Sequence, residues 1–188
     1  MGNRGKRENG KGKRKGSQFE RDVCRILTEW VTGKKDPVIF WRTAGSGSQF
    51  TVKKGKSPMC GDIIAVDPVG APFTDYFCVE CKSRKKIFAT SLLVEDVRSF
   101  REWWEGLVES SERACKGPLL IFRASHHPIY VLMRDLEFYE LVDWAGVPER
   151  YFIVELPWVR GALMSLVRFL DWVDIEVFRA IGEERRKS

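Results

Sequence analysis

Three side chains near the middle of the sequence have the types and spacing that phosphodiester chemistry requires: Asp62, Glu80 and Lys82. Side chains on a strand alternate between faces, so Glu80 and Lys82 would share one face while Cys81 points away. Two carboxylates can hold a hydrated Mg²⁺ ion, and a nearby ammonium can stabilise charge that develops on a phosphate. The pattern therefore predicts metal-dependent cleavage of phosphodiesters.

A β-hairpin is the element expected to position these groups, over Gly61 to Lys86. Two β-branched or aromatic runs, Ile63 to Val66 and Tyr76 to Val79, flank a segment that contains two prolines and a glycine. The turn would lie near residue 71, midway between Asp62 and Glu80. Antiparallel pairing would then bring the two carboxylates side by side at the open end of the hairpin.

The expected metal ligands are oxygen atoms of Asp62 and Glu80, with the backbone carbonyl of Cys81 as a third. Lys82 would orient the attacking water or stabilise the phosphate. A Glu-x-Lys pattern by itself is weakly specific, because surface strands often alternate Glu and Lys. The flanking residues are apolar, however, and a buried carboxylate without a partner is costly. A metal and a lysine would supply those partners.

The cysteines and histidines favour no second metal site. The five cysteines are scattered, which fits a reducing cytoplasm better than a disulfide framework. Cys78 and Cys81 form a CxxC pair, but residues three apart on a strand point to opposite faces, so half of a zinc site is not expected. His126 and His127 precede a proline in a predicted loop, and we assign them no catalytic role.

Length and composition indicate one domain with additions. The chain has 188 residues, of which 44% are apolar, enough for a sizeable core. No apolar run approaches the roughly 20 residues that span a bilayer, and the charged N-terminus does not resemble a signal peptide. We expect a soluble protein of the cytoplasm, with no membrane partner.

The positive charge is concentrated at the N-terminus. Residues 1–16 contain seven Lys or Arg and a single Glu, so this segment alone accounts for the net charge of +6. Its five glycines predict a disordered basic arm. A solubilising tail would explain the composition, but binding to a polyanion is favoured, since a flexible cationic arm gains affinity for phosphates by releasing counterions.

The first predicted helix follows the arm, from Ser17 to Trp30. Ser17 and Glu20 form an S-x-x-E capping box, which would let Glu20 bond the N-cap amide instead of acting in chemistry. Val38 to Arg42 is predicted to form a short strand. The Gly-, Ser- and Lys-rich loop that follows, Thr43 to Gly61, fits neither a Walker loop nor a dinucleotide fingerprint.

The remaining pattern predicts an α/β fold with a mixed central sheet flanked by helices. We expect a helix from Val94 to about Cys115 and two strands, Leu119 to Arg123 and Ile129 to Met133. The last quarter should add a helix, a strand and a long final helix, at Leu136 to Trp144, Tyr151 to Leu156 and Ala162 to about Glu184. The apolar stripe of that final helix is wide enough for either a deeply buried helix or a subunit interface.

Four blocks of the sequence together resemble the archaeal-type Holliday junction resolvases of the PD-(D/E)xK nuclease superfamily. The blocks begin at Arg14, Phe40, Gly61 and Phe77, and read RKGSQFER, FWRTAGS, GDIIA and FCVECK. The resemblance implies a restriction-endonuclease-like fold for residues 17–134, between the arm at 1–16 and a C-terminal extension at 135–188 that packs on the core or at a dimer interface.

The resemblance also implies a homodimer that binds four-way DNA junctions by shape and cuts two opposed strands. Each subunit would hold Mg²⁺, for which Mn²⁺ could substitute, and no small-molecule cofactor is expected. Glu20 would complete the metal site, Arg42 would contact a phosphate, and Ser46 would be the serine of the active-site loop. The loop after Ser46 is longer than in the family, which makes Ser48 a rival.

Basic residues on both sides of the site are the expected DNA contacts. They are Arg14, Lys15, Arg21, Arg42, Lys53, Lys54, Lys56, Arg84, Lys85 and Lys86. Two alternatives stay open at this point. The same fold could serve a restriction-like or processing nuclease of linear duplex, flaps or single strands, or the chain could be a DNA-binding module without catalysis.

Overall fold

The computed structural model describes residues 4–43, 60–84, 98–124 and 127–187, with side chains from Gly16 onward. Its helices are α1 (Arg4–Thr32), η1 (Pro68–Gly70), α2 (Ala71–Tyr76), α3 (Arg98–Arg113), α4 (Asp135–Ala145), α5 (Leu166–Trp172) and α6 (Ile175–Lys187). Its strands are β1 (Phe40–Arg42), β2 (Ile63–Ala65), β3 (Phe77–Arg84), β4 (Gly117–Ala124), β5 (Tyr130–Arg134), β6 (Phe152–Leu156) and β7 (Val159–Ser165).

A five-stranded mixed sheet with the order β3-β4-β5-β7-β6 forms the centre of the molecule. β3 and β4 are parallel, and the other neighbours are antiparallel. β1 and β2 form a separate antiparallel pair beside it. The predicted α/β class with a mixed sheet flanked by helices is confirmed. Among the described residues, no helix is both long and apolar enough to cross a membrane.

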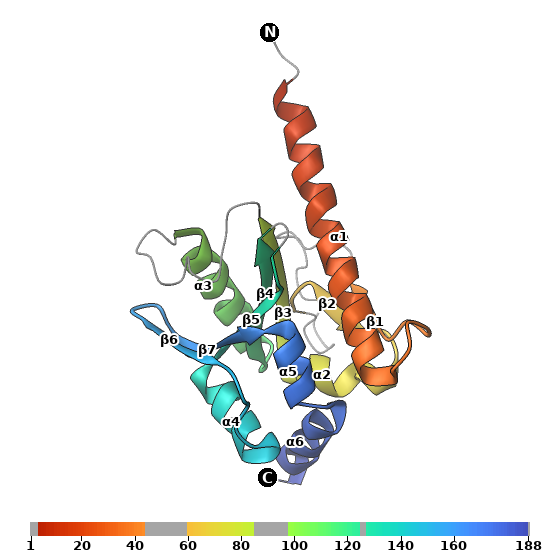
Figure 1. Ribbon diagram of the computed structural model, residues 1–188, viewed down its shortest axis with the longest axis vertical. Helices are drawn as coiled ribbons and strands as arrows, with labels where there is room; N and C mark the ends of the chain where they lie inside the picture. Colours follow the sequence, from red (N-terminus) through yellow and green to blue (C-terminus); the bar gives the residue numbers. More distant parts are fainter. Residues whose placement is uncertain (1–3, 44–59, 85–97, 125–126, 188) are drawn as a thin grey trace.

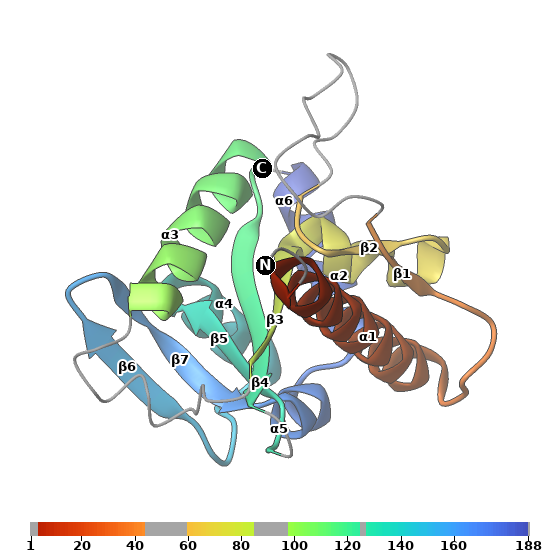
Figure 2. The ribbon, with the colours of Figure 1, turned by 90° about the horizontal axis from the view of Figure 1, so that it is seen from above.

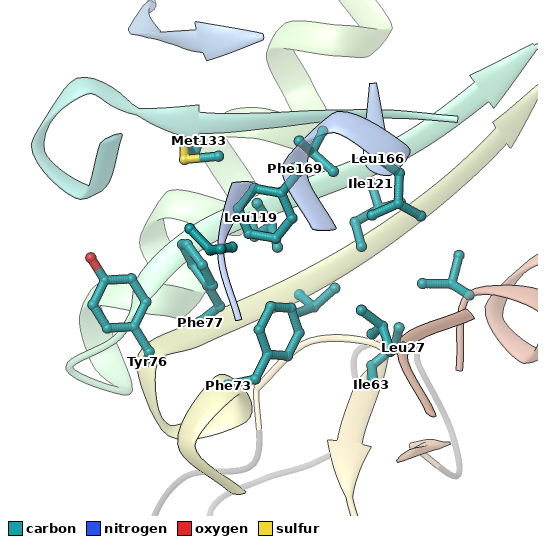
Figure 3. Close-up of a cluster of buried hydrophobic side chains, with 14 of the residues drawn as sticks. Leu27, Ile63, Phe73, Tyr76, Phe77, Leu119, Ile121, Met133, Leu166 and Phe169 are labelled. Atoms are coloured by element: carbon teal, nitrogen blue, oxygen red, sulfur yellow. The ribbon is translucent and has the colours of Figure 1, made fainter. Parts of the chain in front are cut away.

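Helices cover both faces of the sheet (Figure 1, Figure 2). α3 packs on one face through Phe100, Trp104 and Leu107. The larger cluster on the other face joins α1, α2, α4, α5 and α6, and Figure 3 shows Phe169 of α5 close to Phe77 of β3, with ring centroids 6.3 Å apart. The site-bearing strand β3 is therefore held from both sides.

Alternation along β3 sends its cysteines to different faces, as expected. Cys78 packs with the α3 cluster and Cys81 with the larger cluster. The two thiols of the CxxC pair therefore cannot ligate one ion. Each of them packs in a different hydrophobic cluster.

The predicted hairpin over Gly61 to Lys86 is wrong. β2 pairs with β1, and between β2 and β3 the chain forms η1 and α2 instead of a turn near residue 71. Pro68 begins η1, where its fixed φ suits the first helical turn, and the Asp67 carboxylate accepts the Val69 amide at 2.9 Å as a cap. The segment that contacts β3 does so in the parallel sense, through a bridge between Gly61 and Val79.

The predicted final helix is also wrong in its first part. Residues from Ala162 to Ser165 belong to β7, which inserts between β5 and β6, and α5 and α6 follow as separate helices. The Ser165 side chain accepts the Arg168 amide at 3.3 Å and begins α5. The apolar stripe was wide because it runs through a buried strand and two helices.

The start of the first helix also differs from expectation, because α1 begins at Arg4 and continues through Ser17. Extending an existing helix avoids the cost of nucleation, and Lys and Arg are good helix formers. Ser17 is therefore not an N-cap residue, and the capping-box interpretation of Glu20 is wrong. The other predicted helices and strands correspond to α3, α4, β1, β4, β5 and β6, with ends that differ by a few residues.

We expect Gly61→Ala to destabilise the protein strongly. Gly61 has φ +79°, and a Cβ there would lie 2.7 Å from Val79 N and closer still to its carbonyl oxygen. Strain and displacement of β3 should lower the free energy of unfolding by roughly 2–4 kcal/mol in urea titrations. Gly106→Ala in α3 is the matched control, since nothing lies within 4 Å of its Cβ position. It should be neutral or stabilising by up to about 1 kcal/mol, and equal losses for the two variants would contradict this account.

Candidate active site

Hydrogen bonds with β3 and with Thr43, the residue after β1, fix Asp62. Its amide donates to the Val79 carbonyl at 2.6 Å, and its Oδ2 accepts the Cys81 amide at 2.8 Å. On the other side, Thr43 donates its amide to the Asp62 carbonyl and its hydroxyl to the Gly61 carbonyl, both at 2.9 Å. The carboxylate therefore has a single position beside β3.

The environment of Asp62 opposes its ionisation. The residue is 4% exposed, and burial together with the negative charge of Glu80 raises the pKa of Asp62 to about 7. The Cys81 amide and the Lys82 ammonium act in the opposite direction but do not compensate. A buried carboxylate whose pKa lies near neutrality, beside a second carboxylate, is a site that a cation would stabilise.

Glu80 and Lys82 lie on the same side of β3 and form an ion pair between Oε1 and Nζ. Each side chain is about one quarter exposed, so both reach solvent at the edge of the buried Asp62. The Lys82 ammonium also lies 5.9 Å from the centre of the Trp103 ring of α3, and the Arg84 guanidinium lies 5.6 Å from that ring. Trp103 thus borders the basic end of the strand.

Glu20 is buried in α1, with 7% exposure, and faces the site. Its Oε2 accepts Arg42 Nε at 2.8 Å, so α1 and β1 are joined by a charge-assisted hydrogen bond. The negative charge of Glu20 also contributes to the raised pKa of Asp62. The negative charges of Glu20 in α1 and Glu80 in β3 therefore both act on Asp62.

The donors present suit a hard cation. The N–H and C=O of one strand residue point to the same side, so the Cys81 carbonyl faces the side from which Asp62 approaches. In the part of the chain that the structure describes, no three His, Cys, Asp or Glu side chains form a ready ligand set. Mg²⁺ commonly takes one or two carboxylates and keeps several waters, so Asp62, Glu80 and the Cys81 carbonyl fit such an ion.

Several residues expected at the site lie outside the described part of the chain. These are Ser46, Ser48, Lys53, Lys54, Lys56, Lys85 and Lys86. Arg14 and Lys15 belong to α1, for which only the backbone is described there. Arg21 donates to the Gln18 side chain at 3.0 Å on the solvent side of α1.

Sequence reasoning missed three residues that border the site: Thr43, Trp103 and Arg123. Arg123 is the penultimate residue of β4, paired with Ser83 of β3. Its guanidinium lies 4.5 Å from the Phe19 ring, and it pairs with Asp22 at 3.4 Å. Its position could have been inferred only from the parallel pairing, which brings the carboxyl ends of both strands to one edge. No local pattern marks Thr43 or Trp103, because their partners are distant in sequence.

Comparison with known proteins places this arrangement in a class. The family match and the mixed sheet flanked by helices place the chain among nucleases of the PD-(D/E)xK type. More narrowly, the family described as "Phage putative PDDEXK endonuclease" matches residues 11–155, and the chain belongs to it. No curated protein matches the chain.

One solved structure of similar extent is Hjc from Archaeoglobus fulgidus, a Holliday junction resolvase from an archaeal hyperthermophile. The identity is 17% and the TM-score 0.36, over 87% of this chain and 99% of that one. The class assignment rests on the family match over residues 11–155.

Asp62→Asn should stabilise the metal-free protein at pH 8. The folded state binds a proton at Asp62 up to about pH 7, whereas the unfolded carboxyl releases it near its ordinary value of 3.8. The free energy of unfolding therefore falls as the pH rises from about 3.8 to about 7. Above pH 7 the folded protein bears the full cost of an ionised, buried Asp62. Asn removes the charge and can still accept the Cys81 amide, so the free energy of unfolding in EDTA should rise by roughly 2–4 kcal/mol.

The control for this change is Asp75→Asn, at an exposed position on α2. It should leave both the stability and its pH dependence unchanged. A gain for Asp62→Asn that is the same at pH 4 and pH 8 would contradict the proposed origin of the effect.

Proposed function

We propose that the protein is a Mg²⁺-dependent, structure-selective DNA endonuclease that resolves four-way junctions by paired phosphodiester cleavage. The observation that carries the proposal is the burial of Asp62 beside Glu80 and Lys82, with a pKa raised to about 7. The family supports nuclease activity, and the resolvase type is the substrate class suggested by the four sequence blocks. The protein would act in the cytoplasm of a prokaryotic, archaeal or phage-infected cell.

Asp62, Glu80 and the Cys81 carbonyl would hold Mg²⁺, with Glu20 reaching the ion directly or through a water. When bound, the ion would polarise the scissile phosphate and acidify a coordinated water. Lys82 would leave its ion pair with Glu80 to orient that water or to stabilise charge on the phosphate. Asp62 must be ionised to bind the ion, so metal affinity should increase as the pH rises through 7.

DNA would approach the open edge where β3 and β4 end. Arg84, beside the Trp103 ring, and Arg42, which bonds Glu20, would contact phosphates that flank the cut. We assign the same role to Arg21 and, outside the described residues, to Lys53, Lys54, Lys56, Lys85 and Lys86. Paired cuts would require a homodimer, and the extension at 135–188 is the segment that we propose for its interface.

Synthetic DNA substrates of one sequence in several shapes test the activity. With Mg²⁺, the wild type should cut four-way junctions at least about ten times faster than linear duplex, and EDTA should abolish cutting. Asp62→Asn and Glu80→Gln should each reduce cutting by a factor of about 10² or more while junction binding in Ca²⁺ persists.

Two other results would redirect the assignment. Equal cutting of flaps or linear duplex would favour a processing or restriction-like nuclease, as would a monomer in light scattering. Unchanged cutting by Asp62→Asn and Glu80→Gln would show that the site is elsewhere.

Deleting residues 1–13 should weaken DNA binding and flatten its salt dependence, because the deletion removes five of the arm's cationic side chains. The slope of log Kd against log salt should fall by up to about 0.9 for each phosphate that the shortened arm no longer neutralises. Cutting of a saturating junction substrate should be retained. Loss of cutting at saturation would show that the arm does more than bind.

A further inference from the structure

Two thiols that the proposed chemistry does not use lie together beside the acidic site. Cys60 immediately precedes Gly61, and Cys78 immediately precedes Val79. Because Gly61 and Val79 form the parallel bridge between the two segments, Cys60 and Cys78 are neighbours across that bridge. Both side chains also pack in the cluster that α3 covers, so they lie on the same face of the sheet.

The two sulfur atoms are in direct contact, because the Cys60 and Cys78 thiols hydrogen-bond each other. Neighbouring chains in a sheet lie about 4.8 Å apart. That spacing is within the range of Cα separations, about 4.4–6.8 Å, that a disulfide spans. A covalent bond between the two sulfurs therefore requires little movement of the backbone.

Access to solvent differs between the two thiols. Cys60 is partly buried, whereas Cys78 is completely buried in β3. A dissolved oxidant therefore reaches Cys60 first, and the thiol next to the modified sulfur is that of Cys78. An accessible thiol beside a second one is the arrangement in which a reactive cysteine is followed by a resolving cysteine.

We propose that Cys60 and Cys78 are a reversible modification site, which a small-molecule disulfide such as oxidised glutathione converts into an intramolecular disulfide. The Cys60 sulfur attacks oxidised glutathione, forms a mixed disulfide and releases one reduced glutathione. The Cys78 sulfur then attacks the Cys60 sulfur, forms the Cys60–Cys78 bond and releases the second. The protein gives up two thiol protons and two electrons, and the two departing glutathione molecules carry them away. The inference goes beyond the proposed function and does not depend on it.

The bond acts on the acidic site, because each sulfur lies two residues before one of its carboxylates. Cys60 precedes Asp62, and Cys78 precedes Glu80 by the same separation. A covalent link holds the Asp62 segment on β3, where the Asp62 amide donates to the Val79 carbonyl. The oxidised protein therefore opens less often at this point than the reduced protein does.

Mass spectrometry of the folded full chain after incubation with oxidised glutathione tests the proposal. Free thiols are alkylated, the protein is digested without a reductant, and a peptide that links Cys60 to Cys78 is expected. Cys78→Ala should instead retain glutathione on Cys60, because the resolving thiol is absent. Cys115→Ser is the matched control, since Cys115 is an exposed cysteine outside the pair, and this variant should still form the link.

The effect of the bond on the protein is measured in the Cys115→Ser variant. Its oxidised form should melt at least about 5 °C above its reduced form, because the bond joins residues eighteen apart, and dithiothreitol should reverse the gain. The Asp62 amide should exchange its hydrogen about tenfold more slowly after oxidation. The Gly146 amide, which donates to Val142 at the end of α4, is the control and should not change.

Three results would overturn the inference: a link that forms only after unfolding, no glutathione on Cys60 in Cys78→Ala, or equal exchange of the Asp62 amide in the oxidised and reduced forms. None of these measurements involves DNA or a metal ion. Failure of the inference therefore leaves the proposed function standing, and absence of DNA cleavage would leave the inference standing.

Discussion

The close contact between the Gly61–Asp62 backbone and β3 is the constraint on which the site depends. Two hydrogen bonds join this segment to β3. The Asp62 amide donates to the Val79 carbonyl, and the Cys81 amide donates to the Asp62 carboxylate. Only a residue without a Cβ can sit at Gly61, since the Val79 backbone occupies the space a side chain would need. The same segment anchors β1 through Thr43, and β1 in turn positions Arg42 against Glu20 of α1. The burial of the Asp62 carboxylate and its raised pKa follow from this close contact between the Gly61–Asp62 backbone and β3.

The sequence predicted the proximity of Asp62 and Glu80 but not its geometry. A hairpin and a parallel bridge both place residues about eighteen apart beside each other, so spacing alone cannot separate the two. The decisive residues are Asp67 and Pro68, whose cap and fixed φ start a helical turn where a hairpin turn was expected. Glu20 shows the reverse case: the local capping pattern fails because α1 continues past Ser17 to Arg4, and the carboxylate bonds instead to Arg42, which is 22 residues away.

Long-range pairing also explains the other differences. Residues 162–165 have the apolar character of a helix stripe, yet they form a strand because β5 offers them an unpaired edge. Gly161 marks this strand in hindsight: a Cβ there would collide with the Met133 carbonyl of β5, so backbones approach closely at that point. Trp103 likewise gains its place beside Lys82 from the packing of α3 on β3, which no local pattern encodes. Elements defined by their own periodicity, such as α3 and β4, were predictable; those defined by a distant partner were not.

The position of β7 has a consequence for how the chain matures. The strand that separates β5 from β6 is the last of the sheet to be synthesised, although it is not an edge strand. On the ribosome, β5 would present an open, apolar edge until residues 159–165 emerge. The cluster beneath β3 also stays incomplete until Phe169 and Phe178 are added. Synthesis order therefore delays completion of the core that supports the acidic site until residues 159–178 have been made.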